Sequence, residues 1–441
     1  MNLTKNLLIY TIKIGLFGCL FIPLIVTKST FFPFVFGKAI VFQILVEICF
    51  ILWIVWRIKF NENRHCADMQ CQAKTHRSAS LQNYSLIFFF LILIFTTLTS
   101  LDSIRSFWST QERMTGLFNL LHFGMFYIML ITIFRKKDFI WFLRVCLIVS
   151  VIISIITLKF YWTPGRLSGP LGNPGFLALY LLFNIFFGIW LILKPRSIVS
   201  IKDKPSAQRP DFAKQNRDEI AASLPMAAPR NDIMVWLWRM FYTGTIILNF
   251  IVFYYARTRG AYLGLGIGLL LFVLINSVII VRRSKNWSDW RRWTALSVLI
   301  IFLGAGVFAG ISQKSAFLRG SRARTISWRI SFNAFKARPI LGWGPENYIL
   351  AFAKHFDPQY AEQTDEWFDK AHNNVFEYLV TIGIFGLLAY LLIFILASIR
   401  SPGFIMPLLA GYFIANLFWI ETTVSLMLLF LVLALAHEKN F

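Results

Sequence analysis

Long apolar runs alternate with short polar segments along almost the whole chain. A helix needs about 20 apolar residues to cross the roughly 30 Å of hydrocarbon in a bilayer. About twelve runs approach that length, near residues 7–27, 38–56, 84–101, 115–134, 139–158, 175–193, 233–254, 261–281, 294–312, 374–398, 404–419 and 424–437, the last two being the shortest. Because lipid cannot satisfy an open sheet edge, such spans are helices. The pattern predicts an all-α polytopic membrane protein, with about twelve transmembrane helices in a single domain over residues 1–441.

The composition agrees with a chain that lies mostly in lipid. Hydrophobic residues make up 57% and charged residues 15% of the 441 residues, whereas a soluble domain has about 45–50% and about 25%. The net charge of +23 would suit nucleic acid only if the basic residues formed one polar face, but they are spread over short segments between apolar runs. No nucleic-acid partner is expected. The first run, from Leu7 to Val26, lacks a small-residue cleavage site and is interpreted as a retained span.

The distribution of lysine and arginine predicts which side each segment faces. With the N-terminus inside, the inner segments hold 24 of these residues and the short outer loops hold six. The rule applies to short loops, so segment 313–373 is not counted. Both termini are therefore expected in the cytoplasm, and 313–373 is expected to be a large periplasmic loop between late spans. Segments 57–83 and 194–232 lack apolar periodicity and are predicted to be cytoplasmic polar loops, either tolerated insertions or docking sites.

No motif indicates a metal or a nucleotide. The chain has no Gly-rich P-loop, HExxH, GxSxG or DxD-type cluster. His65, Cys66, Cys71 and His76 are potential metal ligands in the first cytoplasmic loop, but they lack the paired histidine module of compact zinc sites. Solvated loop residues are the favoured interpretation and zinc binding the alternative. Neither a metal nor a cofactor is expected.

Charged side chains beside apolar spans cost free energy, so their positions are informative. They gather in four segments that are predicted to lie outside. In the first, 101–116, Arg105 and Arg113 flank Trp108, and Glu112 precedes Arg113. The tryptophan either anchors the neighbouring spans at the interface or forms a platform for a sugar or lipid beside an Arg/Glu pair.

The second and third segments place arginines between apolar spans. In 164–174 (PGRLSGPLGNP), Pro–Gly-rich turns surround Arg166, which is either a snorkelling arginine in a tight turn or part of a close backbone approach to a ligand. In 256–266 (ARTRGAYLGLG), Arg257 and Arg259 stand two residues apart and repel each other unless an anion lies between them. A planar guanidinium binds phosphate bidentately. The pair therefore predicts a diphosphate site or, alternatively, contacts with membrane lipid headgroups.

The fourth segment is the loop 313–373, whose first part is basic and includes Arg322 and Arg329. The apolar spacing from residue 322 to 335 predicts an amphipathic helix. Its apolar face would hold Ile326, Ile330 and Phe335.

The same loop ends at His372, which is followed by Asn373 and the next apolar run. A lone histidine is usually structural, but this one faces a loop rich in arginine, where an imidazole can serve as base, acid or hydrogen-bond donor. Together the four segments place about ten cationic side chains, His372 and a few carboxylates on one face. Such a set suits an anionic ligand embedded in the membrane and processed without a nucleotide, and a lipid-linked diphosphate fits.

The stretch HNNVFEYLVTIGIFG, which begins at His372, resembles the H[NSQ]-x₉-G-x-x-G signature of the O-antigen ligase and polymerase superfamily. The stretches SFWSTQERMTG, GRLSGPLGNPG, RTRGAYLGLG and RPILGWGPENY resemble further segments of that superfamily, in its order, over roughly residues 30–400. Its members include lipid A-core:O-antigen ligases, O-antigen polymerases and bacterial O-linked oligosaccharyltransferases. The resemblance implies a metal-independent glycosyltransferase of lipopolysaccharide biosynthesis, in the bacterial inner membrane and active at its periplasmic face. The donor would be an undecaprenyl-diphosphate-linked glycan.

The resemblance also implies roles for individual residues. By matching motif, Arg166, Arg259 and Arg257 would hold the diphosphate, and His372 would assist attack by an acceptor hydroxyl; Glu112 is a second candidate base. The predicted substrate contacts beyond these are Arg105, Arg113, Trp108, Arg322, Arg329 and Asn373.

Several alternatives remain open at this point. The acceptor is a lipid A-core sugar for a ligase, which is favoured, the end of another glycan for a polymerase, or a protein hydroxyl for an oligosaccharyltransferase. A transporter or flippase for the same lipid-linked glycans is the alternative from a different class. It would need charges along a path through the midplane, where this chain has few, namely Lys13, Arg144 and Arg239.

Overall fold

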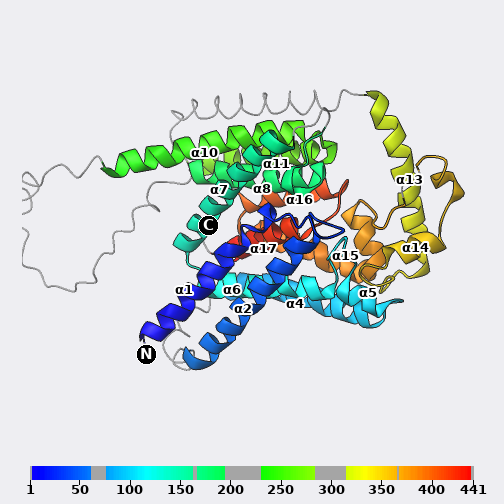
Figure 1. The fold of residues 1–441 in the computed structure, drawn as a ribbon, viewed down its shortest axis with the longest axis horizontal. Helices are drawn as coiled ribbons and strands as arrows, with labels where there is room; N and C mark the ends of the chain where they lie inside the picture. Colours follow the sequence, from blue (N-terminus) through cyan, green and yellow to red (C-terminus); the bar gives the residue numbers. More distant parts are fainter. Residues whose placement is uncertain are drawn as a thin grey trace, which may run out of the picture.

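The computed structural model describes residues 2–60, 76–161, 166–193, 230–283, 314–364 and 367–438, which form helices and turns and contain no strand (Figure 1). The longer helices are α1 (Asn2–Cys19), α2 (Phe36–Phe60), α4 (His76–Leu98), α6 (Leu117–Ile133), α7 (Lys136–Phe160), α8 (Pro174–Leu193), α10 (Arg230–Tyr255), α11 (Arg259–Arg283), α13 (Lys314–Ala337), α15 (Asn374–Arg400), α16 (Ile405–Asn416) and α17 (Thr423–His437). The short ones are η1 (Ile22–Leu24), α5 (Ser103–Trp108), η2 (Gly169–Leu171), α14 (Tyr348–Lys354) and η5 (Pro358–Tyr360). The all-α class is confirmed for this part of the chain.

Eight of the described helices are long and apolar enough to cross a membrane. They are α1 with its continuation to Leu24, α2, α4, α7, α8, α10, α11 and α15, whereas α6, α16 and α17 are apolar but shorter. The predicted run at 294–312 lies outside the described residues, as do 61–75 and 194–229 of the two polar segments. The count of about twelve spans and the sidedness of the loops therefore stay predictions.

The core of the bundle is built around α17. Every residue from Thr423 to Ala436 is buried, and the helix contacts α2, α6, α8 and α15. A helix that is apolar on all sides belongs in such a core. Glycines bring α11 and α16 close together, because a Cβ at Gly264 would collide with the carbonyl oxygen of Gly411.

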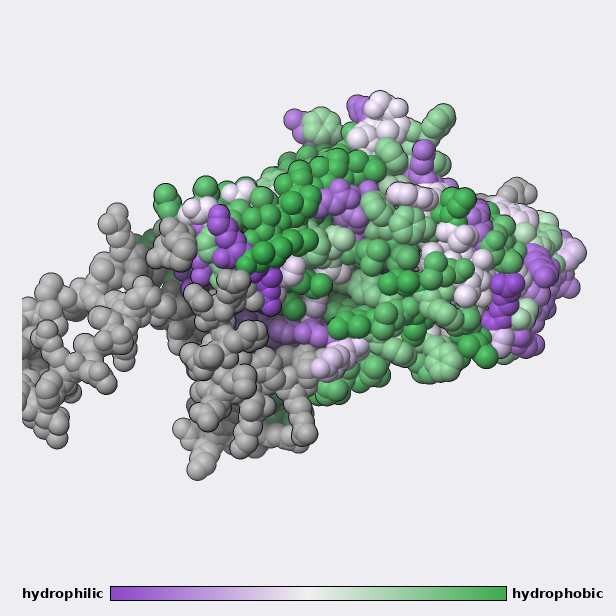
Figure 2. Space-filling view, turned by 90° about the horizontal axis from the view of Figure 1, so that it is seen from below, coloured by the Kyte–Doolittle hydropathy of each residue, from purple (hydrophilic) through white to green (hydrophobic). Residues whose placement is uncertain are grey.

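Residues 314–364 and 367–373, here called the α13–α14 segment, form an extension at one end of the bundle (Figure 1). They have a hydrophobic cluster of their own, centred on Trp343, Tyr348 and Phe352. The predicted amphipathic helix is confirmed in α13, where Ile330 is buried in this cluster and Ile326 packs against it, but half-buried Phe335 is not a member. Apolar side chains cover most of the visible bundle face, and hydrophilic ones gather at this end (Figure 2).

The start of α15 is interrupted at Gly383, whose φ of 68° and ψ of −170° are not helical. The break frees the carbonyl oxygens of Val380 and Thr381, which accept hydrogen bonds of 2.8 Å from the backbone N–H groups of Trp343 and Gly344. The turn 339–344 is thereby docked into the helix. This explains one glycine of the recognised motif, because only glycine readily adopts such a backbone conformation.

Candidate active site

His372 lies at the end of the α13–α14 segment, directly before α15. Its Nδ1 is 3.0 Å from the carbonyl oxygen of Lys370. A carbonyl only accepts, so Nδ1 carries the proton and Nε2 is left as an acceptor. The ring packs on Phe368, with centroids 4.5 Å apart, and Trp419 meets it edge-on at 6.4 Å. The imidazole is therefore held between aromatic rings with one nitrogen already assigned.

Burial lowers the pKa of His372 to about 4. The Lys370 carbonyl and Asp369 act against that shift, whereas the positive charges of Arg324 on α13 and Arg113 add to it. At neutral pH the imidazole is neutral, which is the form that can accept a proton.

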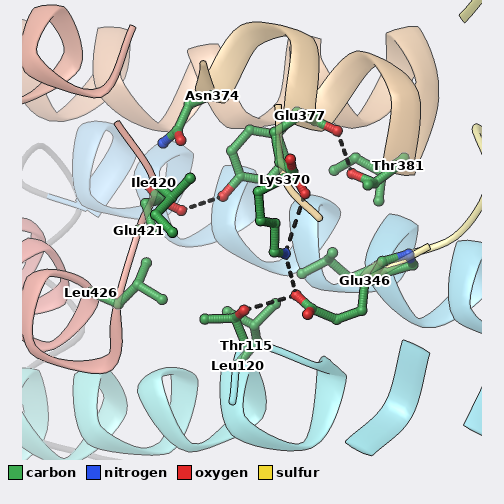
Figure 3. A pocket seen from close by; sticks show the side chains of 14 residues that line it. Thr115, Leu120, Glu346, Lys370, Asn374, Glu377, Thr381, Ile420, Glu421 and Leu426 are labelled. Carbon is green, nitrogen blue, oxygen red and sulfur yellow. Dashed lines mark hydrogen bonds and ion pairs between the residues drawn. The ribbon is translucent and has the colours of Figure 1, made fainter. Parts of the chain in front are cut away.

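Two residues before His372, Lys370 lies between two carboxylates (Figure 3). Its Nζ is 2.5 Å from Glu346 Oε1 and 3.2 Å from Glu377 Oε1. Glu346 also accepts hydrogen bonds of 2.8 Å from the hydroxyls of Ser109 and Thr115. Burial alone would lower the pKa of Lys370, but the two carboxylates outweigh it and raise the pKa, so the ammonium is charged.

The first predicted segment contributes Arg113, which forms a bidentate pair with Asp369 at 2.6 and 2.8 Å. Glu112 lies 3.1 Å from the same guanidinium. Trp108 is 57% exposed, and its ring packs at a tilt against Phe118, with centroids 4.9 Å apart. Arg113 and Glu112 thus lie on the histidine side of the site, and Trp108 presents an exposed ring on the same connection.

The second and third segments meet although about ninety residues separate them. Arg166 Nη2 lies 3.3 Å from Thr258 Oγ1, and its Nε lies 3.4 Å from the Ala256 carbonyl oxygen. Burial lowers the pKa of Arg166, Tyr262 opposes this, and the positive charge of Arg259 lowers the pKa further. Arg257, with a φ of 48°, lies in the same turn. The predicted arginines are therefore neighbours.

A buried lysine holds the loop that carries Arg166. Lys38 on α2 is 2% exposed, and its Nζ donates to the carbonyl oxygens of Ile25 at 2.6 Å and Pro170 at 2.9 Å. Backbone N–H of Leu167 donates to the Tyr255 carbonyl at 3.1 Å. The loop is thus tied to both α2 and the end of α10.

The turn between α16 and α17 connects the arginines to the histidine. Phe418 packs against Gly260, where an added Cβ would lie 2.7 Å from the Phe418 Cβ. Trp419 packs against both Gly175, at the start of α8, and the ring of His372. The N-terminal ends of α8 and α11 and the imidazole therefore converge on two consecutive residues.

Of four further predicted contacts, Asn373 and Arg329 have partners in the structure. The side-chain oxygen of Asn373 caps α15 by accepting from the N–H groups of Val375 and Phe376. Arg329 forms an ion pair with Asp357 on the exposed side of α13. Arg322 is exposed on the same helix, and Arg105, on α5, has a buried Nε without a hydrogen-bond partner among the described residues. None of these contacts brings Arg105, Arg322 or Arg329 to the imidazole.

A small cavity of about 60 Å³ lies against the Lys370 cluster. Glu421, from the α16–α17 turn, lines it and accepts hydrogen bonds from the hydroxyls of Tyr378, Tyr390 and Tyr412 at 2.7 to 3.1 Å. A cavity of this size and polarity has room for a few water molecules. It is far too small for a sugar chain, so it belongs to the support of the site rather than to the substrate.

Sequence reasoning missed Glu346, Lys370, Glu377 and Glu421. Glu346 and Glu377 lie within two stretches that were recognised, GWGPENY and HNNVFEYLV, and Glu421 interrupts two apolar runs. An acidic residue beside spans is a signal, but nothing local shows which lysine it faces. Among the described residues no three His, Cys, Asp or Glu side chains gather to hold a metal ion. Of the candidate zinc ligands, His65, Cys66 and Cys71 lie outside those residues, so metal independence stays a prediction.

Comparison with known families adds one finding. The family model described as O-Antigen ligase matches residues 244–391. Over these residues the chain is similar to the O-antigen ligase superfamily. The matched O-antigen ligase domain contains Arg257, Arg259, the Glu346–Lys370–Glu377 cluster and His372. The recognition made from the motifs is confirmed, and an O-antigen ligase-like membrane enzyme is supported. No curated protein sequence matches the chain.

Proposed function

We propose that this protein is a membrane glycosyltransferase that moves a glycan from undecaprenyl diphosphate to an acceptor hydroxyl at the periplasmic face, as an O-antigen ligase does. One observation carries the proposal. His372, a neutral imidazole with an assigned acceptor nitrogen, packs against Trp419 of the α16–α17 turn. The adjacent Phe418 packs against Gly260, which directly follows Arg259, the neighbour of Arg166. The superfamily match includes His372 and Arg259.

The arginines suit a diphosphate. Arg166 and Arg259 repel each other, and an anion between them would remove that repulsion while accepting planar, bidentate hydrogen bonds. Membrane lipids surround the apolar bundle and would carry the polyprenyl chain of the donor. The small residues of the loop, held by Lys38, let backbone approach the ligand closely.

The reaction is a displacement at the anomeric carbon of the donor sugar. The acceptor oxygen forms a bond to that carbon while the bond from the carbon to the phosphate oxygen breaks, and the electron pair leaves with the lipid diphosphate. The proton of the acceptor hydroxyl passes to Nε2 of His372. Fixed cations stabilise the growing negative charge of the leaving group, which is the kind of term that contributes most to many enzymes.

The positions of the other charges favour an enzyme over a transporter. In the part of the spans that the structure describes, Lys13 is paired with Asp138 at 2.8 Å. Arg144 lies between the rings of Trp141 and Trp238, 4.6 and 4.3 Å from their centroids. Both charges have fixed partners, which favours an enzyme over a transporter that needs free charges along a path between the two faces.

The test is transfer by the purified protein. Wild-type protein in lipid nanodiscs, given an undecaprenyl-diphosphate-linked glycan and a lipid A-core acceptor in the presence of a chelator, is expected to form a glycan–acceptor product seen by mass spectrometry. Arg259→Ala should lower the rate by about 10²–10³ and His372→Ala by about 10²–10⁴, with normal folding. Arg57→Ala is the control for loss of an arginine, because Arg57 lies in the last turn of α2, whereas Lys38, which holds the Arg166 loop, lies in its first turns.

Two results would reject parts of the proposal. Wild-type-like transfer by either variant removes that residue from the chemistry, and movement of the donor across the bilayer without a new bond assigns the protein to the transporter class. Expression in strains that lack a ligase or a polymerase then distinguishes the acceptors. Repair of the ligase strain is the expected outcome.

A further inference from the structure

Hydrogen bonds and an ion pair hold the three consecutive residues 370–372, the last of which carries the imidazole. The carbonyl of Lys370 accepts from His372 Nδ1 at 3.0 Å, and the N–H of the intervening Ala371 donates to Glu377 Oε2 at 2.8 Å. The other oxygen of Glu377 faces the Lys370 ammonium at 3.2 Å. One carboxylate therefore fixes both the side chain of Lys370 and the peptide that follows it.

The backbone at His372 needs such support. Its φ is 50°, in the left-handed region that residues with a Cβ seldom adopt. A residue persists there only when its surroundings hold it, and such positions concentrate at functional sites. Without the contacts of its neighbours, His372 would relax to an ordinary conformation and its ring would turn away from Phe368 and Trp419.

The second carboxylate anchors the arrangement to the rest of the fold. Glu346 follows closely on the turn 339–344, which is docked at the break of α15, and its own φ is 63°. It binds Lys370 Nζ at 2.5 Å and accepts from Ser109 and Thr115, which lie between α5 and α6. Lys370 is thus the point at which α15, the docked turn and the α5–α6 connection meet (Figure 3).

We propose that Glu346, Lys370 and Glu377 form a positioning triad, which touches no substrate but fixes the direction and the tautomer of His372. The inference rests on the proposed function of His372. The buried ammonium keeps the two carboxylates together, and Glu377 holds the peptide from which the imidazole receives its hydrogen bond. Removing the charge of either Lys370 or Glu377 is therefore expected to let the imidazole of His372 turn toward water.

The groups that surround the His372 imidazole determine how its pKa would change if the ring left this environment. They are Asp369 on its own loop, Arg113 from the α5–α6 connection and Arg324 from α13, together with the rings of Phe368 and Trp419. Burial is the main cause of the lowered pKa of His372. A ring released from this environment is expected to titrate near the ordinary histidine value of about 6.5.

The experiment follows the imidazole of His372 by NMR in the full-length protein labelled at histidine, with its signal identified by its loss in His372→Gln. In wild type the ring is expected to titrate with a pKa of about 4. In Lys370→Met and in Glu377→Gln it is expected near 6.5. Lys13→Met removes a lysine–carboxylate pair on a distant helix and should leave the titration unchanged.

The two substitutions separate positioning from simple electrostatics. Loss of the Lys370 charge raises the pKa of a nearby imidazole, whereas loss of the Glu377 charge lowers it. A purely electrostatic influence therefore moves the His372 titration in opposite directions in the two variants. Loss of positioning moves both upward.

Transfer gives a second readout. Because the base is the neutral imidazole, the acid limb of the pH–rate profile should move up with the pKa. At pH 5.5 each variant should lose about tenfold relative to its own rate at pH 8, whereas wild type should lose almost nothing. A merely structural defect lowers the rate equally at both pH values.

Unchanged titration of His372 in both folded variants, or opposite shifts, overturns the positioning triad. Either result leaves the proposed function intact if His372→Ala still abolishes transfer. Conversely, normal transfer by His372→Ala removes His372 from the proposed chemistry, while the NMR titration still reports on the triad. If Lys370→Met fails to fold, Glu377→Gln, which keeps the shape of the side chain, carries the test alone.

Discussion

Replacing Gly383 by alanine should separate the turn 339–344 from α15 and thereby lower both the stability of the protein and its transfer rate. Gly383 has a φ of 68° and a ψ of −170°, a combination that is almost restricted to glycine. An added Cβ would lie 2.8 Å from the backbone nitrogen of Leu341 and closer still to the carbonyl oxygen of Ile340. The obstacle is backbone on both sides, so no side-chain rotation relieves it.

The expected cost follows from the contacts that would be lost. Three backbone hydrogen bonds of 2.8 to 2.9 Å join the turn to the broken helix, and each contributes about 0.5–1.5 kcal/mol. The strained conformation of a residue with a Cβ adds about 1–3 kcal/mol. Together these give about 2.5–7.5 kcal/mol. That is comparable with the whole stability of many domains, so the turn should leave the helix rather than tolerate the methyl group.

Because Glu346 follows this turn and holds Lys370, loss of docking should also lower the transfer rate. The assay is a thermal unfolding curve and a transfer rate for Gly383→Ala in the same detergent as wild type. Gly244→Ala is the matched control, since nothing lies within 4 Å of a Cβ at that helical position and alanine there should be neutral or stabilising. Wild-type stability and transfer in Gly383→Ala would refute the reasoning that the glycine is required by the docked turn.

Two further predictions concern the charged side chains. Arg113→Ala leaves Asp369 without its bidentate partner at 2.6 and 2.8 Å and, because both side chains keep some solvent contact, should cost about 2–4 kcal/mol, somewhat less than a fully buried pair. Burial acts to raise the pKa of Asp369, but the hydrogen bonds and charge of Arg113 outweigh it and lower the pKa. The stability that this pair contributes is therefore present above the ordinary pKa of aspartate and is lost as the pH falls through the lowered pKa. Unfolding curves of wild type and Arg113→Ala should consequently converge in acid. Lys38→Met leaves the carbonyls of Ile25 and Pro170 without the ammonium that donates to them, which should lower the free energy of unfolding by about 1–3 kcal/mol. The substitution should also raise KM for the lipid-linked glycan more than it changes kcat. An unchanged KM would show that the Arg166 loop does not depend on the lysine.

Much of the fold was predictable because its causes are local. A run of apolar residues forms a helix wherever lipid or core surrounds it, so all the runs that fall within the described residues are helices. The face of α13 that holds Ile326 and Ile330 followed from spacing alone. What spacing could not decide is the environment of each helix. The shortest run, 424–437, became the buried centre of the bundle because α2, α6, α8 and α15 surround it.

The site divides in the same way. Sequence determined which residue types could do the chemistry, since His372 and the arginines stand in recognisable stretches beside apolar runs, where unneeded charge is costly. Only tertiary structure decided that Arg166 neighbours Arg259, that Trp419 packs on the imidazole, and that Lys370 lies between Glu346 and Glu377. Whether a segment forms a helix depends mainly on residues within a few turns of one another, and the sequence shows these directly. The partner of a buried charge is set by which distant segments pack together, and that depends on all the helices at once.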